Sequence, residues 1–214
     1  MYQGHFNLFK KQTAAQSSGN LYILSGPSGV GKTTIMNQLL KEIPKLEKIV
    51  AFTTRPMRPG EISGKSYHFI SCEEFKTKIK SEDFLEYIIF NGNYYGFGLT
   101  KSQTLEKLNS GTDLVVDMDY HNVLTIKSMI PHCISIFIMP SSISELQARL
   151  IRRSDDPESI AKRMRFAQKS IDHSGGYDKI VINANDKLDT AVSDIKTIML
   201  DHKNETIHQK LKYA

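Results

Sequence analysis

The stretch Gly26-Pro27-Ser28-Gly29-Val30-Gly31-Lys32-Thr33, just after the apolar run Leu21-Tyr22-Ile23-Leu24, decides the fold. It is a complete G-x-x-x-x-G-K-[ST] pattern, whose glycines let successive backbone N–H groups turn inward toward phosphates. The motif requires a strand before it and a helix after it. Residues 34–41 supply the helix, because their apolar side chains share one helical face. The stretch therefore predicts a nucleoside triphosphate site on a strand–loop–helix unit.

The polar side chains of this loop have separate expected roles. Lys32 is predicted to reach the β- and γ-phosphate oxygens, and the Thr33 hydroxyl to coordinate Mg²⁺. Asp117 follows the apolar run 114–116, where the carboxyl end of a parallel strand faces a ligand crevice, so we expect it to organise the same metal. The predicted ATP-binding residues of the loop are Gly26, Pro27, Ser28, Gly29, Val30, Gly31, Lys32, Thr33 and Thr34.

Further short apolar runs, at residues 114–116, 134–139 and 180–182, alternate with helical patterns. Such runs are typical of buried parallel strands, so we predict an α/β fold with a parallel central sheet flanked by helices. The 214 residues, 40% hydrophobic and 24% charged, suit one domain with inserted lobes, predicted to span residues 21–204. Residues 1–20 read as a mobile leader and residues 205–214 as a polar tail.

Composition narrows the class of protein. No apolar stretch approaches the roughly 20 residues that span a bilayer, and the first residues lack the apolar core of a signal peptide, so we expect a cytoplasmic protein without membrane contact. Cys72 and Cys133 form no C-x-x-C pair, which argues against a zinc site or a disulfide framework. The net charge of +5 suits either nucleic acid or polyanionic nucleotides, and its distribution has to decide between them.

Three later segments indicate the substrate class. They are residues 53–61 (T-T-R-P-M-R-P-G-E), residues 64–69 (G-K-S-Y-H-F) and residues 91–96 (N-G-N-Y-Y-G). Because these segments occur in this order after a phosphate loop, the chain resembles the guanylate kinase family of P-loop nucleoside monophosphate kinases. The resemblance runs from about residue 20 to residue 200. The resemblance implies a GMP-binding lobe over about residues 50–100 and a mobile lid over about residues 141–173.

Two arginines three residues apart, with two tyrosine hydroxyls, form a set of donors suited to a second, non-transferred phosphate. By resemblance, Arg55, Arg58, Tyr67 and Tyr95 clamp the phosphate of GMP. Glu86 matches the residue that reads guanine, whose neighbouring N1–H and N2 amino groups a carboxylate can accept. Asp119 matches a second acidic residue near the bound monophosphate.

The predicted lid carries arginines that, by resemblance, fold over the transferring phosphate and neutralise its charge. These catalytic candidates are Arg149, Arg153 and Arg163. Arg152 and Arg165 add two more positive charges to this segment. A basic helix face or an RNA-binding patch therefore stays open as an alternative to a catalytic lid. Asn183, after the run 180–182, aligns with the residue that borders the ATP adenine.

The chain departs from the family pattern at the guanine end. Ala51 stands where the family usually has serine, and Phe97 stands where a serine or threonine normally reads the guanine O6. Thr100, after a longer loop, is a candidate to take over that hydrogen bond; otherwise the contact is lost. Residues 120–122 (Tyr-His-Asn) stand where the family often has glutamine and glycine.

The sequence thus predicts an ATP:GMP phosphotransferase that uses Mg²⁺ and also accepts dGMP, with no nucleic acid partner and with homo-oligomerisation left open. Loss of turnover is expected for Lys32→Ala and for Arg153→Ala. Two alternatives remain: a non-catalytic guanylate-kinase-like module that binds proteins, and a related P-loop kinase with another phosphorylated acceptor. A GTPase is disfavoured, because the D-x-x-G match at residues 172–175 has no accompanying N-K-x-D segment.

Overall fold

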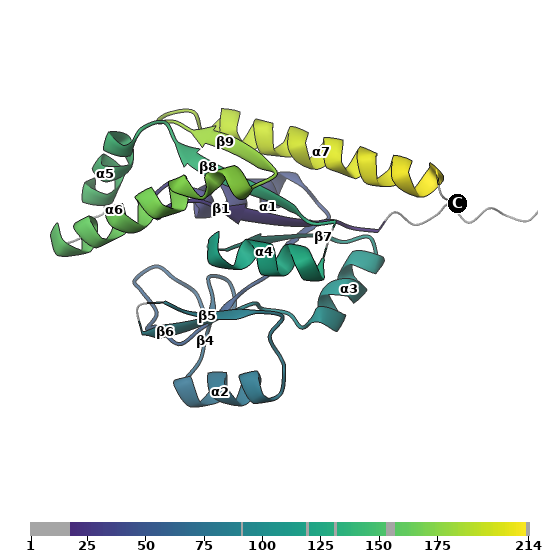
Figure 1. Ribbon diagram of the computed structural model, residues 1–214, viewed down its shortest axis with the longest axis horizontal. Helices are drawn as coiled ribbons and strands as arrows, with labels where there is room; N and C mark the ends of the chain where they lie inside the picture. The colour runs from purple at the N-terminus through teal and green to yellow at the C-terminus, as the bar shows by residue number, and fades with distance from the viewer. Residues whose placement is uncertain (1–17, 91, 119, 131, 153–156, 213–214) are drawn as a thin grey trace, which may run out of the picture.

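The computed structural model describes residues 18–212 except 91, 119, 131 and 153–156. Its larger sheet has five parallel strands in the order β2-β7-β1-β8-β9 (Figure 1). The strands are β1 (Leu21–Ser25), β2 (Leu46–Lys48), β7 (Asp113–Asp117), β8 (Ile134–Pro140) and β9 (Lys179–Asn183). The prediction of an α/β fold with a parallel central sheet is confirmed.

Side chains of the central strand β1 alternate between two buried layers. Tyr22 and Leu24 pack with α1 (Lys32–Glu42) and α7 (Leu188–Lys212) on one face. Leu21 and Ile23 pack on the other face with α3 (Lys101–Asn109) and α4 (Tyr120–Met129). Apolar residues on both faces are what a sheet covered on both sides requires, and Figure 1 shows α7 and α4 on opposite sides of it.

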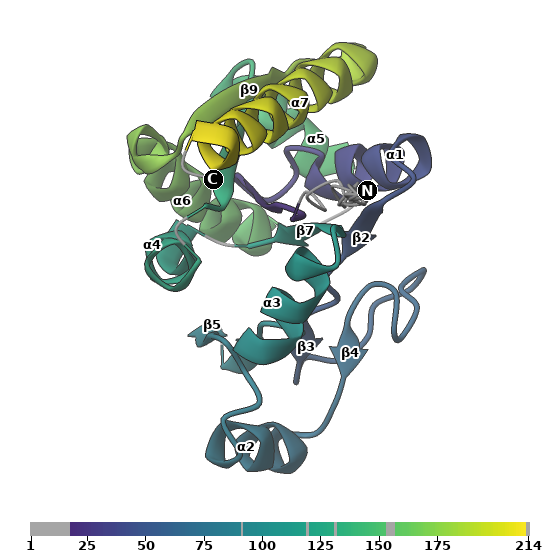
Figure 2. The same ribbon diagram turned by 90° about the vertical axis from the view of Figure 1, so that its right-hand side faces the viewer.

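A smaller four-stranded sheet forms a separate lobe, with strand order β4-β3-β6-β5 (Figure 2). Its elements are β3 (Phe52–Thr53), β4 (His68–Phe69), α2 (Cys72–Lys80), β5 (Tyr87–Phe90) and β6 (Asn93–Gly96). Phe75 of α2 is fully buried, and the centroid of its ring lies 4.4 Å from that of Phe84 and 5.1 Å from that of Tyr94. This lobe, held by its own aromatic cluster, covers the segment expected to bind GMP.

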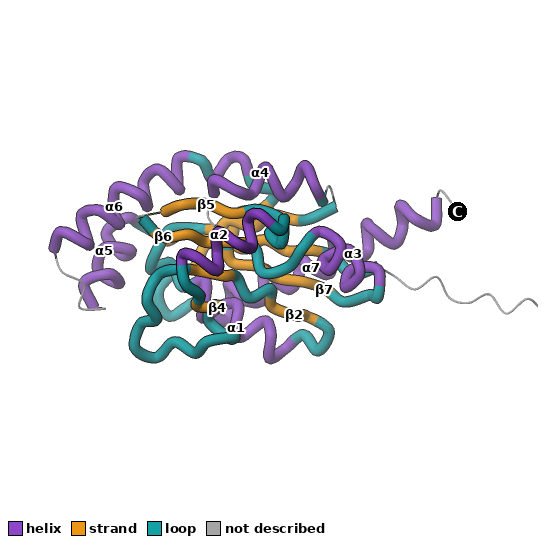
Figure 3. The backbone as a smooth tube through the Cα atoms, turned by 90° about the horizontal axis from the view of Figure 1, so that it is seen from below, coloured by secondary structure: helices purple, strands orange, loops and turns teal. Residues whose placement is uncertain are grey.

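The predicted lid corresponds to two helices, α5 (Ile143–Arg152) and α6 (Pro157–Asp172), followed by the short 3₁₀ turn η1 (Ser174–Gly176). Figure 3 shows both helices at one end of the molecule and the last turns of α7 at the other. Residues 205–212, which belong to the predicted polar tail, are helical and form the last turns of α7. Among the described residues, no helix is both long and apolar enough to cross a bilayer.

Candidate active site

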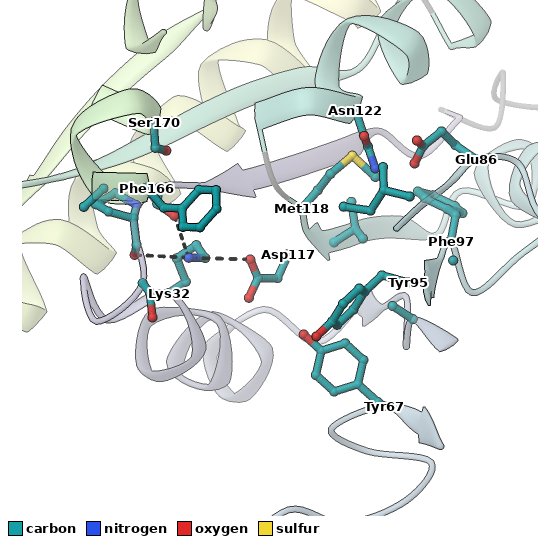
Figure 4. A pocket seen from close by; sticks show the side chains of 18 residues that line it. Lys32, Tyr67, Glu86, Tyr95, Phe97, Asp117, Met118, Asn122, Phe166 and Ser170 are labelled. Atoms are coloured by element: carbon teal, nitrogen blue, oxygen red, sulfur yellow. Dashed lines mark hydrogen bonds and ion pairs between the residues drawn. The ribbon is translucent and has the colours of Figure 1, made fainter. Parts of the chain in front are cut away.

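A cavity of about 280 Å³ lies between the larger sheet, the lobe and helix α6. Leu24 and Asp117 are paired in the parallel register, so the carboxyl ends of β1 and β7 lie side by side. Both ends open into this cavity. Figure 4 shows Lys32 and Phe166 on one side of the cavity, Glu86 and Asn122 on the other, and Asp117 between them. The sequence-distant segments that were predicted to bind two nucleotides therefore meet in one place.

The phosphate loop has the backbone that its glycines permit. Gly26, Gly29 and Gly31 have φ of 142°, 89° and 102°, which side-chain-bearing residues rarely adopt. The Lys32 ammonium donates hydrogen bonds to the Gly26 carbonyl at 2.7 Å and the Pro27 carbonyl at 3.3 Å, and lies 4.0 Å from an Asp117 carboxylate oxygen. Lys32 is thus held inside the loop, facing the cavity.

A second hollow, of about 310 Å³, lies on the outer side of the loop and is lined by Gly31, Thr34, Arg149 and Asn183. The Asn183 amide donates to the Val30 carbonyl at 2.7 Å, and a Cβ on Gly31 would lie 2.5 Å from that amide nitrogen. Gly31 is therefore needed for close approach as well as for its backbone conformation. Asn183, predicted to border adenine, also fastens the phosphate loop to the end of β9.

Arg149 lies on this outer side. Its guanidinium donates to the Val30 carbonyl at 3.0 Å and the Asn183 carbonyl at 2.9 Å, and forms an ion pair with Glu145 one turn earlier. These contacts connect the first lid helix to the loop and to β9. The structure therefore places Arg149 where it supports the loop, on the side away from Asp117 and the lobe.

Thr33 and Asp117 are a reasonable donor set for Mg²⁺. Thr33 is exposed in the first turn of α1, and Asp117 ends β7 beside Lys32. Hydroxyl and carboxylate oxygens are the ligands that this hard cation prefers, and Mg²⁺ bound with a nucleotide takes most of its other ligands from phosphates and water. Within the described residues, no cluster of three or more His, Cys, Asp or Glu competes as a metal site.

In the lobe, Arg55 is buried and held in a fixed orientation. Its guanidinium makes two hydrogen bonds to the Glu61 carboxylate, at 2.7 and 2.5 Å, and its Cζ lies 5.1 Å from the Tyr67 ring centroid. Glu61 also accepts the backbone N–H of Arg58 at 2.8 Å, and this ordering of the loop leaves Arg58 at the exposed surface. Sequence reasoning quoted Glu61 in the motif without giving it this role.

Tyr67 and Tyr95 stand between the lobe and the end of β7. Their ring centroids are 6.2 Å apart, and Figure 4 shows both hydroxyls directed toward the Asp117 region of the cavity. Burial, and then the negative charge of Asp117, raise the pKa of Tyr67 well above its ordinary value. The Tyr67 hydroxyl therefore stays protonated near neutral pH and can donate to an anion.

At the far end of the cavity, Glu86 precedes β5 and its main chain is fixed by a hydrogen bond from the Phe97 N–H to the Glu86 carbonyl, 2.8 Å. Burial raises the pKa of the Glu86 carboxyl to about 7, against a smaller lowering by a hydrogen bond with Asn122. Phe97 is 3% exposed and lines this end together with Ile88 and Met118. An ionised carboxylate here has two oxygens that can accept hydrogen bonds from paired N–H groups of a ligand.

The second lid helix contributes one face to the cavity. Arg163 donates to the Ser28 hydroxyl of the phosphate loop at 3.4 Å, and Phe166 and Ser170 line the cavity one and two turns later. Ser170 is buried, and within the described part of the chain its hydroxyl has no hydrogen-bond partner. Arg163 was predicted from the sequence, whereas Phe166 and Ser170 were missed, although their helical spacing from Arg163 was a readable signal. Arg153, the remaining lid candidate, lies outside the described residues.

Two predictions for the GMP side have other outcomes. Thr100 is the N-cap of α3: its hydroxyl accepts the Gln103 N–H at 3.2 Å, and it does not line the cavity. The expectation that Thr100 reads guanine is therefore not supported by its position, because its hydroxyl serves the helix. Asp119 lies outside the described residues. Asn122 lines the cavity near Glu86 and was not among the predicted site residues, since an asparagine after a variable motif gives no signal by itself.

Comparison with known proteins gives one consistent result. The guanylate kinase family model matches residues 18–202. The chain is 43% identical over 188 residues to a guanylate kinase of Pseudoalteromonas translucida, covering 87% of this chain and 89% of the relative. It is 40% identical over 202 residues to that of Haemophilus influenzae, covering 92% and 95%. The crystal structure of guanylate kinase from Anaplasma phagocytophilum covers 88% of each chain, with a TM-score of 0.73 and 28% identity. This chain belongs to the guanylate kinase family.

Proposed function

We propose that this protein transfers the γ-phosphate of ATP to GMP, giving ADP and GDP. The observation that carries the proposal is that one cavity has the phosphate loop at one end and the half-buried Glu86 at the other. Tyr67 and Tyr95 line the cavity between these ends, with Arg55 packed against Tyr67, where an acceptor phosphate would face the donor. A cavity with two phosphate-binding regions and one base-reading end suits a transfer between two nucleotides.

On the donor side, the loop N–H groups and Lys32 would hold the β- and γ-phosphates of ATP. Phosphate oxygens would replace the Gly26 and Pro27 carbonyls as partners of the ammonium, which already points into the cavity. Bound Mg²⁺, held through Thr33 and organised by Asp117, would supply positive charge to the β- and γ-phosphate oxygens. Arg163, poised over Ser28, would add a second positive group as the lid closes.

On the acceptor side, the GMP phosphate is already an anion near neutral pH, so it can attack the γ-phosphorus without a strong general base. The work of the protein is then positioning and charge stabilisation. Arg55, oriented by Glu61, and the two tyrosine hydroxyls would fix the acceptor oxygens in line with the donor. No covalent intermediate on the protein is required.

Base selection would rest on Glu86. In its ionised form the carboxylate accepts hydrogen bonds from guanine N1–H and the N2 amino group, whereas adenine has no N1–H and would leave the carboxylate unpaired. The proposed contacts involve the base and the phosphate, so dGMP is expected to be an acceptor as well. The absence of nucleic acid partners, a cytoplasmic location and the oligomeric state stay predictions from the sequence.

The two alternatives are less well supported. A protein-binding module without catalysis has no need of a lysine held in a complete phosphate loop beside a strand-terminal aspartate. A kinase for another phosphorylated acceptor has no need of a carboxylate placed in an apolar base pocket. Lys32 and Glu86 therefore favour the guanine nucleotide.

The test is ADP release from ATP and Mg²⁺ with GMP, dGMP, AMP or UMP as the acceptor. We expect turnover with GMP and dGMP and far less with AMP and UMP, and loss of turnover in Lys32→Ala. ATP binding without turnover for any acceptor would support the protein-binding module. A preference for another monophosphate would support a kinase for a different acceptor and overturn the proposal.

A further inference from the structure

Asn122 occupies an unexpected position in the first turn of α4. It is 6% exposed, lines the guanine end of the cavity and is the immediate neighbour of the Glu86 carboxyl there. Figure 4 shows the Asn122 amide facing that carboxyl across the end of the cavity. A buried amide at the edge of a binding cavity needs hydrogen-bond partners, and Glu86 supplies one of them.

Among the described residues, the rest of this end is poor in side-chain donors suited to guanine O6. Phe97 presents a ring, and Ile88 and Met118 line the same region with apolar side chains. Thr100 uses its hydroxyl at the start of α3. A bound guanine would bring its O6 oxygen next to its N1–H, and so next to the carboxylate that accepts the N1–H. An O6 buried there without a donor would weaken binding.

We propose that the Asn122 side-chain amide donates a hydrogen bond to guanine O6, and so acts with Glu86 as a specificity-determining residue. The inference rests on the proposed function, since it concerns the same GMP site. One N–H of the amide stays with the Glu86 carboxylate and the other meets O6, so the three polar groups of the guanine edge are all paired.

The contact with Glu86 also sets which end of the amide faces the base. An ionised carboxylate accepts hydrogen bonds and donates none, so it holds the NH₂ end of Asn122 toward the ligand and the amide oxygen away from it. Adenine would place its own amino group against this NH₂ group and would offer Glu86 no N1–H. Asn122 therefore adds a repulsive element against adenine to the attraction for guanine.

The experiment compares kcat/KM for GMP and 6-thio-GMP, which keeps N1–H and the N2 amino group but replaces O6 with sulfur, a weak acceptor. We expect the wild type to prefer GMP by about threefold to tenfold, the range for one neutral hydrogen bond. Asn122→Ala should lower kcat/KM for GMP by a similar factor and bring the two substrates to near equality. Thr100→Val should keep the wild-type preference.

Several outcomes would overturn the inference without touching the proposed function. These are GMP turnover by a wild type that does not distinguish the two substrates, an equal loss for both in Asn122→Ala, or loss of the preference in Thr100→Val. An equal loss would mean that Asn122 only orients Glu86. Asn122→Leu, which keeps the side-chain volume, replaces the alanine variant if thermal unfolding shows that the latter is not folded. A wild type with no GMP turnover overturns the proposed function itself.

Discussion

The donor and acceptor halves of the site are built in different ways. The donor half is centred on one continuous stretch, residues 26–34, whose shape depends on backbone conformation at three glycines with positive φ. The acceptor half gathers side chains that are far apart in the chain: Arg55 follows β3, Tyr67 and Glu86 precede β4 and β5, and Tyr95 and Asn122 belong to β6 and α4. A site made of backbone is sensitive to an added Cβ, whereas a site made of side chains is sensitive to the identity of each one.

Lys32→Ala removes the one side chain of the phosphate loop on which the donor half depends most. We expect this variant to show the largest loss of kcat. Loss of the ammonium removes positive charge from the transferring phosphate, and the removal of one such preorganised group lowers kcat by about 10² to 10³. Steady-state ADP release measures it. Lys41→Ala, an exposed lysine in the last turn of the same helix, is the matched control. Near-normal kcat in folded Lys32→Ala would contradict the role.

Arg55→Lys tests the acceptor half with the charge retained. A lysine cannot make the two parallel hydrogen bonds to Glu61, nor present a planar group over Tyr67. We expect KM for GMP to rise about 10- to 100-fold, which is the effect of losing a hydrogen bond between charged groups. KM for ATP should change little. A parallel rise in both constants would show that the two halves are not separable.

The pH dependence of GMP binding sharpens the comparison further. The Glu86 carboxyl, with its pKa raised by burial to about 7, must be ionised to accept the guanine N–H groups. GMP binding therefore releases a proton below this pH, and KM for GMP should rise by up to about tenfold for each unit that the pH falls below 7. KM for ATP should not share this dependence.

Glu86→Gln is the control, because the GMP phosphate also takes up a proton near pH 6 and does so equally in both proteins. An identical pH profile in both proteins would mean that Glu86 is already ionised at low pH. The ligand-free protein should show the opposite sign in stability. Because the folded pKa lies above the ordinary value of 4.5, the contribution of Glu86 to stability is present below about pH 4.5 and is lost as the pH rises to about 7.

These contrasts also explain what the sequence could and could not predict. The strand, loop and first helix follow from local pattern, since β1, the glycines and α1 are adjacent in the chain. The family resemblance located Arg55, Tyr67, Glu86 and Tyr95, and the structure brings the last three to one cavity, with Arg55 beside Tyr67. The parallel order of the sheet places Asp117 beside Lys32, as a residue at the end of a strand should be.

The rest depended on tertiary packing. Glu61 was visible in the motif, but only the fold shows that its carboxylate meets the Arg55 guanidinium. Asn122 faces Glu86 because α4 and the lobe meet across the cavity, a contact between segments 36 residues apart in sequence. Helical spacing could have identified Phe166 and Ser170 as one face of α6, but not the direction in which that face points.

Thr100→Ala should have the smallest effect, and it separates a capping role from a binding role. Thr100 forms a capping box with Gln103 at the start of α3, so its loss should destabilise the fold by about 1 kcal/mol. KM for GMP should stay within about twofold, the range of changes that leave the site untouched. Ser71→Ala, which removes the matching capping box of α2, controls for lobe stability. Urea unfolding and GMP kinetics measure the two quantities, and a large rise in KM without loss of stability would return Thr100 to the guanine site in place of Asn122.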